Sequence, residues 1–435
     1  MAAPRRRFSP FSSRKPEKTL TPISRNDTIG NHTKEDFPAY YLMSGGVDLK
    51  TISEINEKIR SGTAVVLTAE EVVRMAREQG VKETAKKVDV VTTGTFSPMC
   101  SSGAFLNFGH AEPLIRMSGV KLNDVPACAG RAAVDCFLGA TELSETRGMD
   151  YGGAHGIEDL IAGKKVHLSA RSYGTDCYPR KSLEAEVGLS DMNQCFLFNP
   201  RNAYQNYNCS VNTSDRIIHT YMGTLLPHMA NATYATAGEL SPLLKDPELR
   251  TIGIGTRVFF CGAQGYVVWE GTQCFPGCTE YEDGVKSYSG ATLALIGDMK
   301  KMSTDYVRAA RIYQYGVSMF VGVGIPFPVL DEDLCAFLSK GNDELFTEVS
   351  DYSVPLRSRP VLRKRVSYAE LRSGTVEVCG KKIPTAPMTS LKKSRDIALE
   401  LKRQVQQGEF LLTEPSAKLP LDTTKHVLHA LDDPQ

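Results

Sequence analysis

Short segments with helical spacing alternate with short apolar runs along the first part of the chain. Ile52, Ile55 and Ile59 recur at the interval of one helical face, and Ser61-Gly62 ends that segment. Residues 64–68 then form a compact apolar run that predicts a buried strand.

The same alternation continues for one more unit. Residues 70–78 have a helical pattern, and residues 88–91 form a second apolar run that predicts the next strand. The order strand, helix, strand predicts a βαβ unit with parallel strands.

Later segments extend the list of predicted elements. Small residues dominate residues 126–141, which predicts a closely packed helix with Cys128 and Cys136 buried and unreactive on it. Helices are also predicted over 302–315, 331–338 and 390–407, and strands over 166–170 and 317–323.

Together these patterns predict an α/β fold with a mixed or mostly parallel sheet, flanking helices and a Gly/Thr-rich β middle section. That middle section covers about 215–300 and contains β-like runs at 257–260 and 265–269. Residues 1–40 are predicted to be a disordered basic tail, residues 45–415 the folded catalytic region, with two subdomains as an alternative, and residues 416–435 a C-terminal tail.

Composition narrows the class of protein. The 435 residues have a formal net charge of +1, which argues against a general nucleic-acid or membrane-surface binder. No stretch approaches the roughly 20 apolar residues that span a bilayer. The 11 cysteines, without a secretory leader, favour reduced thiols and a cytoplasmic protein. The Arg-rich start of the chain leaves an organellar transit peptide as the alternative.

Two cysteines lie in polar, glycine-containing loops and are the best candidates for chemistry. Cys100 is followed by Ser101-Ser102-Gly103, a run that can direct backbone N–H groups and hydroxyls at an anion. Cys177 lies near cationic side chains that favour the thiolate, although Asp176 opposes them. Because each cysteine follows a predicted strand, we expect the two thiols to lie close together.

Three further residues are candidates for substrate binding. His110 has the residue type of an acid or base, with a packed or surface histidine as the alternative. Arg180 and Lys181 could hold a substrate carboxylate, Arg180 in bidentate fashion.

Motifs for metals and organic cofactors are weak or missing. Cys274 and Cys278 have a spacing compatible with a metal, but no second pair stands at a suitable interval. The chain has no Walker motif, no complete dinucleotide fingerprint and no Gly-x-Ser-x-Gly elbow. We therefore expect no metal and no cofactor.

Several sequence blocks resemble those of a known family, the homocysteine biosynthesis proteins, which are L-aspartate semialdehyde sulfurtransferases. The blocks that contain the candidate cysteines are residues 99–110 (MCSSGAFLNFGH) and 173–181 (YGTDCYPRK). Further matching blocks are residues 90–96, 220–223, 237–242, 251–256, 269–273 and 384–387. The resemblance extends from about residue 45 to 415, nearly the whole chain.

The resemblance implies that Cys100 and Cys177 are the two functional cysteines. It also implies conversion of L-aspartate semialdehyde to L-homocysteine through a cysteine persulfide, with a sulfide or persulfide donor and an external reductant. Many members have regulatory CBS domains or work beside a ferredoxin-like partner, and we expect a separate ferredoxin-like reductant here because this chain has neither extension.

Two other classes of function remain open at this point. A thiol redox sensor would use a Cys100–Cys177 disulfide without turnover. A metal-binding or scaffolding protein would use the remaining cysteines.

Overall fold

The computed structural model describes residues 49–202, 206–421, 426 and 428. The predicted tail at 1–40 lies outside the described residues, and the domain boundaries stay a prediction. At the C-terminal side, Ala417 forms a bridge with Ile254, so the chain is still paired to the folded part at this position.

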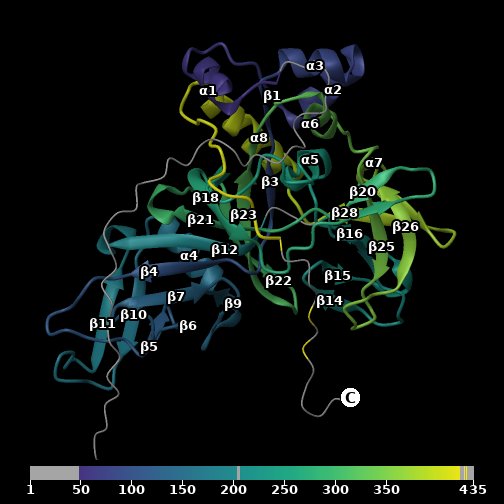
Figure 1. The fold of residues 1–435 in the computed structure, drawn as a ribbon. Helices are drawn as coiled ribbons and strands as arrows, with labels where there is room; N and C mark the ends of the chain where they lie inside the picture. The colour runs from purple at the N-terminus through teal and green to yellow at the C-terminus, as the bar shows by residue number, and fades with distance from the viewer. Residues whose placement is uncertain (1–48, 203–205, 422–425, 427, 429–435) are drawn as a thin grey trace, which may run out of the picture. The chain divides into compact units, whose positions relative to one another are not determined.

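The predicted βαβ unit is confirmed (Figure 1). Strands β1 and β2 pair in parallel, and α2 lies between them in sequence. Thr51 and Glu54 form a capping box at the start of α1, which explains why that helix begins where the apolar spacing begins. The bounds are α1 (Ile52–Arg60), β1 (Val66–Thr68), α2 (Ala69–Gln79), α3 (Val81–Lys87), β2 (Val90–Thr92) and β24 (Pro326–Pro328), which pairs with β2.

A nine-stranded sheet forms the largest part of the fold. Its order is β22-β23-β17-β18-β21-β12-β4-β7, with β3 paired to β23, and its neighbours are antiparallel. The bounds are β3 (Thr95–Pro98), β4 (Gly103–Asn107), β7 (Asp135–Gly139), β12 (Gln194–Asn202), β17 (Arg257–Phe260), β18 (Ala263–Glu270), β21 (Leu293–Asp298), β22 (Val307–Ile312) and β23 (Gly316–Gly324).

A six-stranded sheet of order β26-β25-β13-β16-β28-β27 combines parallel and antiparallel pairs. The predicted α/β class with mixed sheets is therefore confirmed, and the mostly parallel alternative is not what forms. The bounds are β13 (Cys209–Val211), β16 (Ala232–Tyr234), β25 (Phe346–Asp351), β26 (Val361–Ser367), β27 (Thr375–Val378) and β28 (Lys381–Pro387).

A four-stranded antiparallel sheet of order β11-β10-β5-β6 is connected to the large sheet through a bridge between Cys128 and Phe137. The bounds are β5 (Gly119–Leu122), β6 (Val125–Ala127), β10 (Val166–Arg171) and β11 (Ser182–Val187). Three hairpins complete the strands: β8 (Leu143–Ser144) with β9 (Gly148–Gly152), β14 (Ile218–Thr220) with β15 (Gly223–Leu225), and β19 (Cys278–Glu280) with β20 (Lys286–Tyr288).

The remaining helices cover the sheets and include the two predicted near the C-terminus. Asp331 caps α6 and Ser390 caps α8, each accepting a hydrogen bond from a backbone N–H three residues later. The bounds are α4 (Gly153–Ile161), α5 (Pro242–Lys245), α6 (Glu332–Leu338), α7 (Tyr368–Arg372) and α8 (Leu391–Gln406). None of the helices in the described residues has both the length and the apolar composition that a membrane crossing requires.

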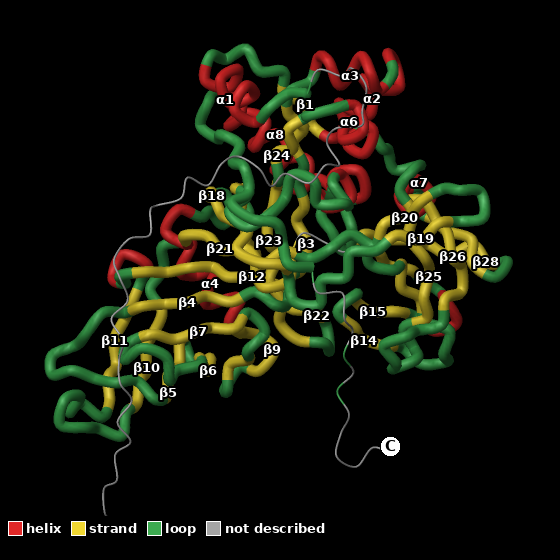
Figure 2. The backbone as a smooth tube through the Cα atoms, viewed as in Figure 1, coloured by secondary structure: helices red, strands yellow, loops and turns green. Residues whose placement is uncertain are grey.

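Two predicted helices are wrong, because both segments are strands (Figure 2). Residues 126–141 contain β6 and β7, and β7 alternates buried Cys136 and Leu138 with half-buried Phe137. Cys136 is buried as predicted, but Cys128 is exposed. Residues 302–315 contain β22, which pairs along its length with β23. In both segments pairing with neighbouring strands outweighs the helical preference of small residues.

Candidate functional site

Cys100 lies in a tight turn between β3 and β4. Met99 N–H donates to Met319 O at 2.7 Å, and Ser102 N–H donates to Met99 O at 3.2 Å, so backbone bonds hold both sides of the cysteine. Residue 103, where β4 begins, must lack a side chain, because a Cβ at Gly103 would lie 2.2 Å from a ring atom of Phe137.

The buried side chain of Asn199 holds this turn from the neighbouring strand β12. Its Nδ2 donates to Ser102 Oγ at 2.8 Å, and its Oδ1 accepts a hydrogen bond from Ser101 Oγ at 3.1 Å. The same Oδ1 accepts from Arg201 N–H at 2.9 Å. One carboxamide therefore links the residues after Cys100 to the end of β12.

Two hydroxyl groups lie near the Cys100 thiol. The sulfur lies 3.2 Å from Ser318 Oγ on β23, and the Tyr315 hydroxyl, in the turn before β23, is near enough for the thiol to affect its pKa. Burial, together with the neighbouring Cys100 thiol, raises the pKa of Tyr315 to about 12. The Tyr315 hydroxyl is therefore protonated near neutral pH and can donate to a thiolate, and Ser318 can do the same.

Tyrosines line the space beside Cys100. The ring centroid of Tyr221 lies 6.4 Å from that of Tyr315, 6.4 Å from that of Tyr207 and 5.9 Å from that of Tyr352. Tyr221 Oη also donates to Tyr352 Oη at 3.3 Å. We name Tyr207, Tyr221, Tyr315 and Tyr352 the tyrosine cluster.

Cationic and imidazole groups border this cluster. The charge of Arg201 acts on the Tyr207 hydroxyl, and the Arg359 guanidinium carbon lies 4.1 Å from the centre of the Tyr352 ring. The His219 ring lies 5.2 Å from that of Tyr313 in the same β22–β23 turn as Tyr315. Burial raises the pKa of Tyr207, with the charges of Tyr221 and Cys100 adding to the effect. The phenols of the tyrosine cluster thus lie beside the Cys100 thiol and two guanidinium groups.

Cys177 lies in the exposed loop between β10 and β11, where Thr175 Oγ1 is 3.4 Å from its sulfur. Thr175 and Tyr178 exchange backbone hydrogen bonds of 3.0 and 3.1 Å, which form a closed turn around the cysteine. The thiol is therefore accessible on an ordered loop.

The prediction that Cys100 and Cys177 lie close together is wrong within one chain. Cys100 precedes β4, whereas the Cys177 loop contacts the segment after β4, where the His110 and Tyr178 rings stack at 6.3 Å. Strand β4 alone spans roughly 14 Å, and three strands separate β10 from β4 in the order β5, β6, β7. A disulfide needs Cα atoms within about 7 Å. Figure 1 shows β10 and β11 well apart from β3 and β22. Both cysteines follow a strand, but in antiparallel sheets the ends of two strands need not lie at the same edge. Their shared placement after a strand therefore does not bring the thiols together.

The predicted substrate-binding residues lie around Cys177 and not around Cys100. Arg180 donates from Nε to Pro113 O at 3.0 Å and from Nη2 to Glu112 O at 2.5 Å, so its guanidinium anchors the loop. The Lys181 side chain packs beside Gly174, and His110 is exposed. Their role in substrate binding stays a prediction.

Residue-by-residue reading of the sequence missed most of the groups around Cys100. Ser318 lies in a segment predicted only as a strand, Tyr315 lies at the end of a predicted helix, and Asn199 lies in a segment for which no element was predicted. Tyr221 lies in residues 220–223, one of the blocks that resemble the family. That block was the one sequence signal that could have pointed to the tyrosine cluster.

The buried thiols of Cys136, Cys195 and Cys209 are less suited to chemistry. Burial raises the pKa of Cys136 and Cys209 to about 12 and that of Cys195 to about 11. Within the described residues, no group of three or more His, Cys, Asp or Glu side chains could hold a metal ion.

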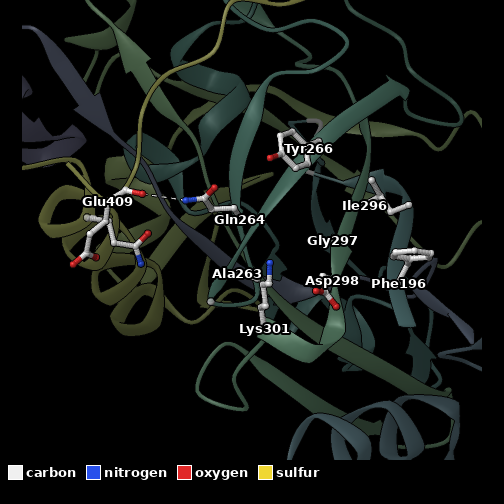
Figure 3. Close-up of a pocket in the computed structure, with 11 residues that line it drawn as sticks. Phe196, Ala263, Gln264, Tyr266, Ile296, Gly297, Asp298, Lys301 and Glu409 are labelled. Atoms are coloured by element: carbon white, nitrogen blue, oxygen red, sulfur yellow. Dashed lines mark hydrogen bonds between the residues drawn. The ribbon is translucent and has the colours of Figure 1, made fainter. Parts of the chain in front are cut away.

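A surface depression of about 640 Å³ lies elsewhere, over β18 and β21 and the end of α8 (Figure 3). Gln264 Nε2 donates to Glu409 O at 3.1 Å along one side of it. Its lining contains no cysteine, so it offers no group for sulfur chemistry.

Comparisons with known proteins address the resemblance directly. Residues 64–412 match the family model described as homocysteine biosynthesis enzyme, sulfur-incorporation. The chain is 50% identical over 370 residues to the L-aspartate semialdehyde sulfurtransferase of Methanosarcina acetivorans, covering 85% of this chain and 72% of that protein. It is 45% identical over 381 residues to the protein of the same name from Methanocaldococcus jannaschii, covering 84% of this chain and 72% of that protein. No solved structure gives a significant match. The family match extends over most of the chain, and the chain therefore belongs to the homocysteine biosynthesis enzyme family.

Proposed function

We propose that this protein transfers sulfur to L-aspartate semialdehyde and forms L-homocysteine at Cys100. The observation that carries the proposal is the half-buried Cys100 thiol, 3.2 Å from the Ser318 hydroxyl and near the Tyr315 hydroxyl of the tyrosine cluster. Two relatives that are 50% and 45% identical are named L-aspartate semialdehyde sulfurtransferase.

The net reaction needs two electrons when sulfide supplies the sulfur. The aldehyde, hydrogen sulfide, two protons and two electrons give the thiol and one water. With a persulfide donor, four electrons and four protons are needed, because the sulfane sulfur must also be reduced. A separate ferredoxin-like protein is the proposed source of these electrons.

The persulfide route assigns a step to each group at Cys100. The thiolate takes the sulfane sulfur from the donor persulfide, and the donor leaves as a thiol. The terminal sulfur of the Cys100 persulfide then bonds to the aldehyde carbon, whose oxygen takes the electron pair of the C=O bond. A protonated hydroxyl such as that of Tyr315 is suited to donate to this oxygen.

Reduction completes the proposed sequence. Attack of a second thiol on the Cys100 sulfur breaks the S–S bond, releases a thiohemiacetal and leaves a disulfide, which two electrons reopen. Loss of water from the thiohemiacetal gives a thioaldehyde, and two further electrons and two protons give the product thiol.

Cys177 is the proposed second thiol. Its loop is ordered and exposed, but it is too far from Cys100 of the same chain for direct exchange. We therefore place the exchange between Cys177 of one copy and Cys100 of another. The alternative of a redox sensor with an internal Cys100–Cys177 disulfide loses its geometric basis for the same reason.

The test is product formation by purified, reduced protein. The protein is incubated with L-aspartate semialdehyde, sulfide or a low-molecular-weight persulfide, and a low-potential reductant, and homocysteine is measured by mass spectrometry. Product that depends on enzyme and sulfur donor supports the proposal, and its absence with every donor and reductant would refute it.

A further inference from the structure

Arg201 is built into the structure that holds Cys100. Its backbone N–H donates to Asn199 Oδ1 at 2.9 Å, and its carbonyl accepts from Ser101 Oγ at 3.4 Å. The position of Arg201 is thus fixed by the same hydrogen bonds that fix the cysteine turn.

The side chain of Arg201 is also fixed. Its Nε donates to Thr272 O at 3.1 Å and to Thr272 Oγ1 at 3.3 Å. Both Arg201 and Cys100 are near enough to Tyr207 for their charges to act on its hydroxyl. The guanidinium and the thiol therefore share Tyr207 as a neighbour.

In the described part of the chain, no carboxylate lies within ion-pair distance of Arg201. This distinguishes it from Arg250, Arg308 and Arg363, which pair with Asp331, Glu158 and Glu370. A guanidinium has five N–H donors, and among the described residues the hydrogen bonds of the Arg201 side chain to Thr272 use only its Nε. The arrangement leaves a cation available for an anionic group beside Cys100.

We propose that Arg201 binds the α-carboxylate of the substrate at the Cys100 site. This inference rests on the proposed function, since it concerns the same aldehyde. In L-aspartate semialdehyde the carboxylate and aldehyde carbons are only roughly 4 Å apart, since three single bonds join them. One short substrate would therefore have its carboxylate on Arg201, whose carbonyl accepts from Ser101 beside Cys100, and its aldehyde at the Cys100 sulfur. A planar guanidinium suits a carboxylate.

Arg201 takes the role that the sequence suggested for Arg180. The donors of Arg180 are engaged by the carbonyls of Pro113 and Glu112, and its loop is remote from Cys100. The two arginines therefore form a matched pair for an experiment.

The experiment compares substrates with and without the carboxylate. Turnover of L-aspartate semialdehyde and of 3-aminopropanal is measured for wild type, Arg201→Gln, Arg201→Lys and Arg180→Gln. Arg201→Gln should reduce kcat/KM for L-aspartate semialdehyde about 100-fold, through a raised KM, and leave kcat/KM for 3-aminopropanal within about threefold. Arg201→Lys should recover part of the loss. Arg180→Gln should affect both substrates equally.

A binding measurement separates this inference from the proposed function. Calorimetry with the unreactive alcohol L-homoserine should show binding that Arg201→Gln weakens about 100-fold, with no such change for 3-amino-1-propanol. This result would support the carboxylate site even if turnover were absent. Equal losses for both ligands in Arg201→Gln, or a carboxylate-specific loss in Arg180→Gln, would overturn the inference.

Discussion

Asn199 donates a hydrogen bond of 2.8 Å to Ser102, two residues after Cys100, from a side chain that is fully buried. Its carbonyl oxygen accepts from Ser101 at 3.1 Å, so one amide fixes both hydroxyls of the cysteine turn. This makes Asn199 a positioning residue for the thiol, although it does not touch the sulfur itself.

Replacing Asn199 should therefore disturb the reaction more than the fold. Asn199→Asp keeps the acceptor but loses the donor to Ser102, and kcat should fall about 10- to 100-fold with little change in KM. Steady-state kinetics and circular dichroism measure the two effects. A variant with wild-type kcat and an unchanged rate of Cys100 alkylation would show that the amide does not position the turn.

Tyr315→Phe tests the effect of the neighbouring hydroxyl on the Cys100 thiol. The ring stays in the tyrosine cluster, but the hydroxyl that could donate to the thiolate is lost and Ser318 Oγ, 3.2 Å from the sulfur, remains. We expect Cys100 alkylation by iodoacetamide at neutral pH to slow several-fold and homocysteine formation to fall about 10-fold. Tyr313→Phe, in the same turn, is the matched control and should leave both rates unchanged.

Mixing two inactive variants tests the proposed exchange between copies. Cys100→Ser and Cys177→Ser should each lose homocysteine formation while remaining folded, since serine can form neither the persulfide at position 100 nor the disulfide at position 177. An equal mixture, dissociated and reassembled, should recover about a quarter of wild-type activity, because half of the dimers then have one complete pair of thiols. Two inactive variants that show no recovery on mixing would contradict exchange between copies.

Lys245 gives the stability of the protein a specific pH dependence. Its Nζ is buried and donates to Leu338 O at 2.9 Å and Lys340 O at 2.6 Å. Burial lowers the pKa of Lys245 from 10.5 to about 7. Between these two values the unfolded chain binds more protons than the folded chain, so this residue makes the free energy of unfolding rise with pH.

Lys245→Met removes this proton linkage. Urea denaturation at pH 7.5 and pH 9.5 should show that the free energy of unfolding of wild type gains, relative to the variant, up to about 1.4 kcal/mol per pH unit. The comparison uses the slope and not the absolute stability, because the variant also leaves two carbonyl groups without their donor. Parallel slopes would show that Lys245 titrates at its ordinary pKa.

Local sequence patterns predicted the elements whose ends are marked by caps. Thr51, Asp331 and Ser390 each begin a helix at the predicted place, because a side-chain oxygen that accepts a backbone N–H is a local signal. The segments 126–141 and 302–315, which contain β6, β7 and β22, were predicted as helices, because a local pattern does not show that they pair with the neighbouring strands β5, β4 and β23.

The residues of the candidate site likewise divide into those that local sequence could indicate and those that it could not. Cys100 and Cys177 were predicted as functional from their polar loops, and the structure leaves Cys177 exposed and Cys100 half-buried, while their function stays a prediction. The neighbours of Cys100 come from β12, β23 and the turn before β23, more than 90 positions away, and no local pattern encodes that contact. The expected meeting of the two cysteines was wrong because it required a strand order that the antiparallel sheet does not have.

The most direct test of the central claim is homocysteine formation by Cys100→Ser beside Cys128→Ser. Cys128 is exposed on the surface and bonds only weakly, at 3.7 Å, to Arg131. Both variants should fold like wild type, because serine replaces each thiol with little change in volume. Mass spectrometry of the product should find no homocysteine with Cys100→Ser and wild-type amounts with Cys128→Ser. Wild-type amounts of homocysteine from Cys100→Ser would contradict the claim that sulfur transfer takes place at Cys100.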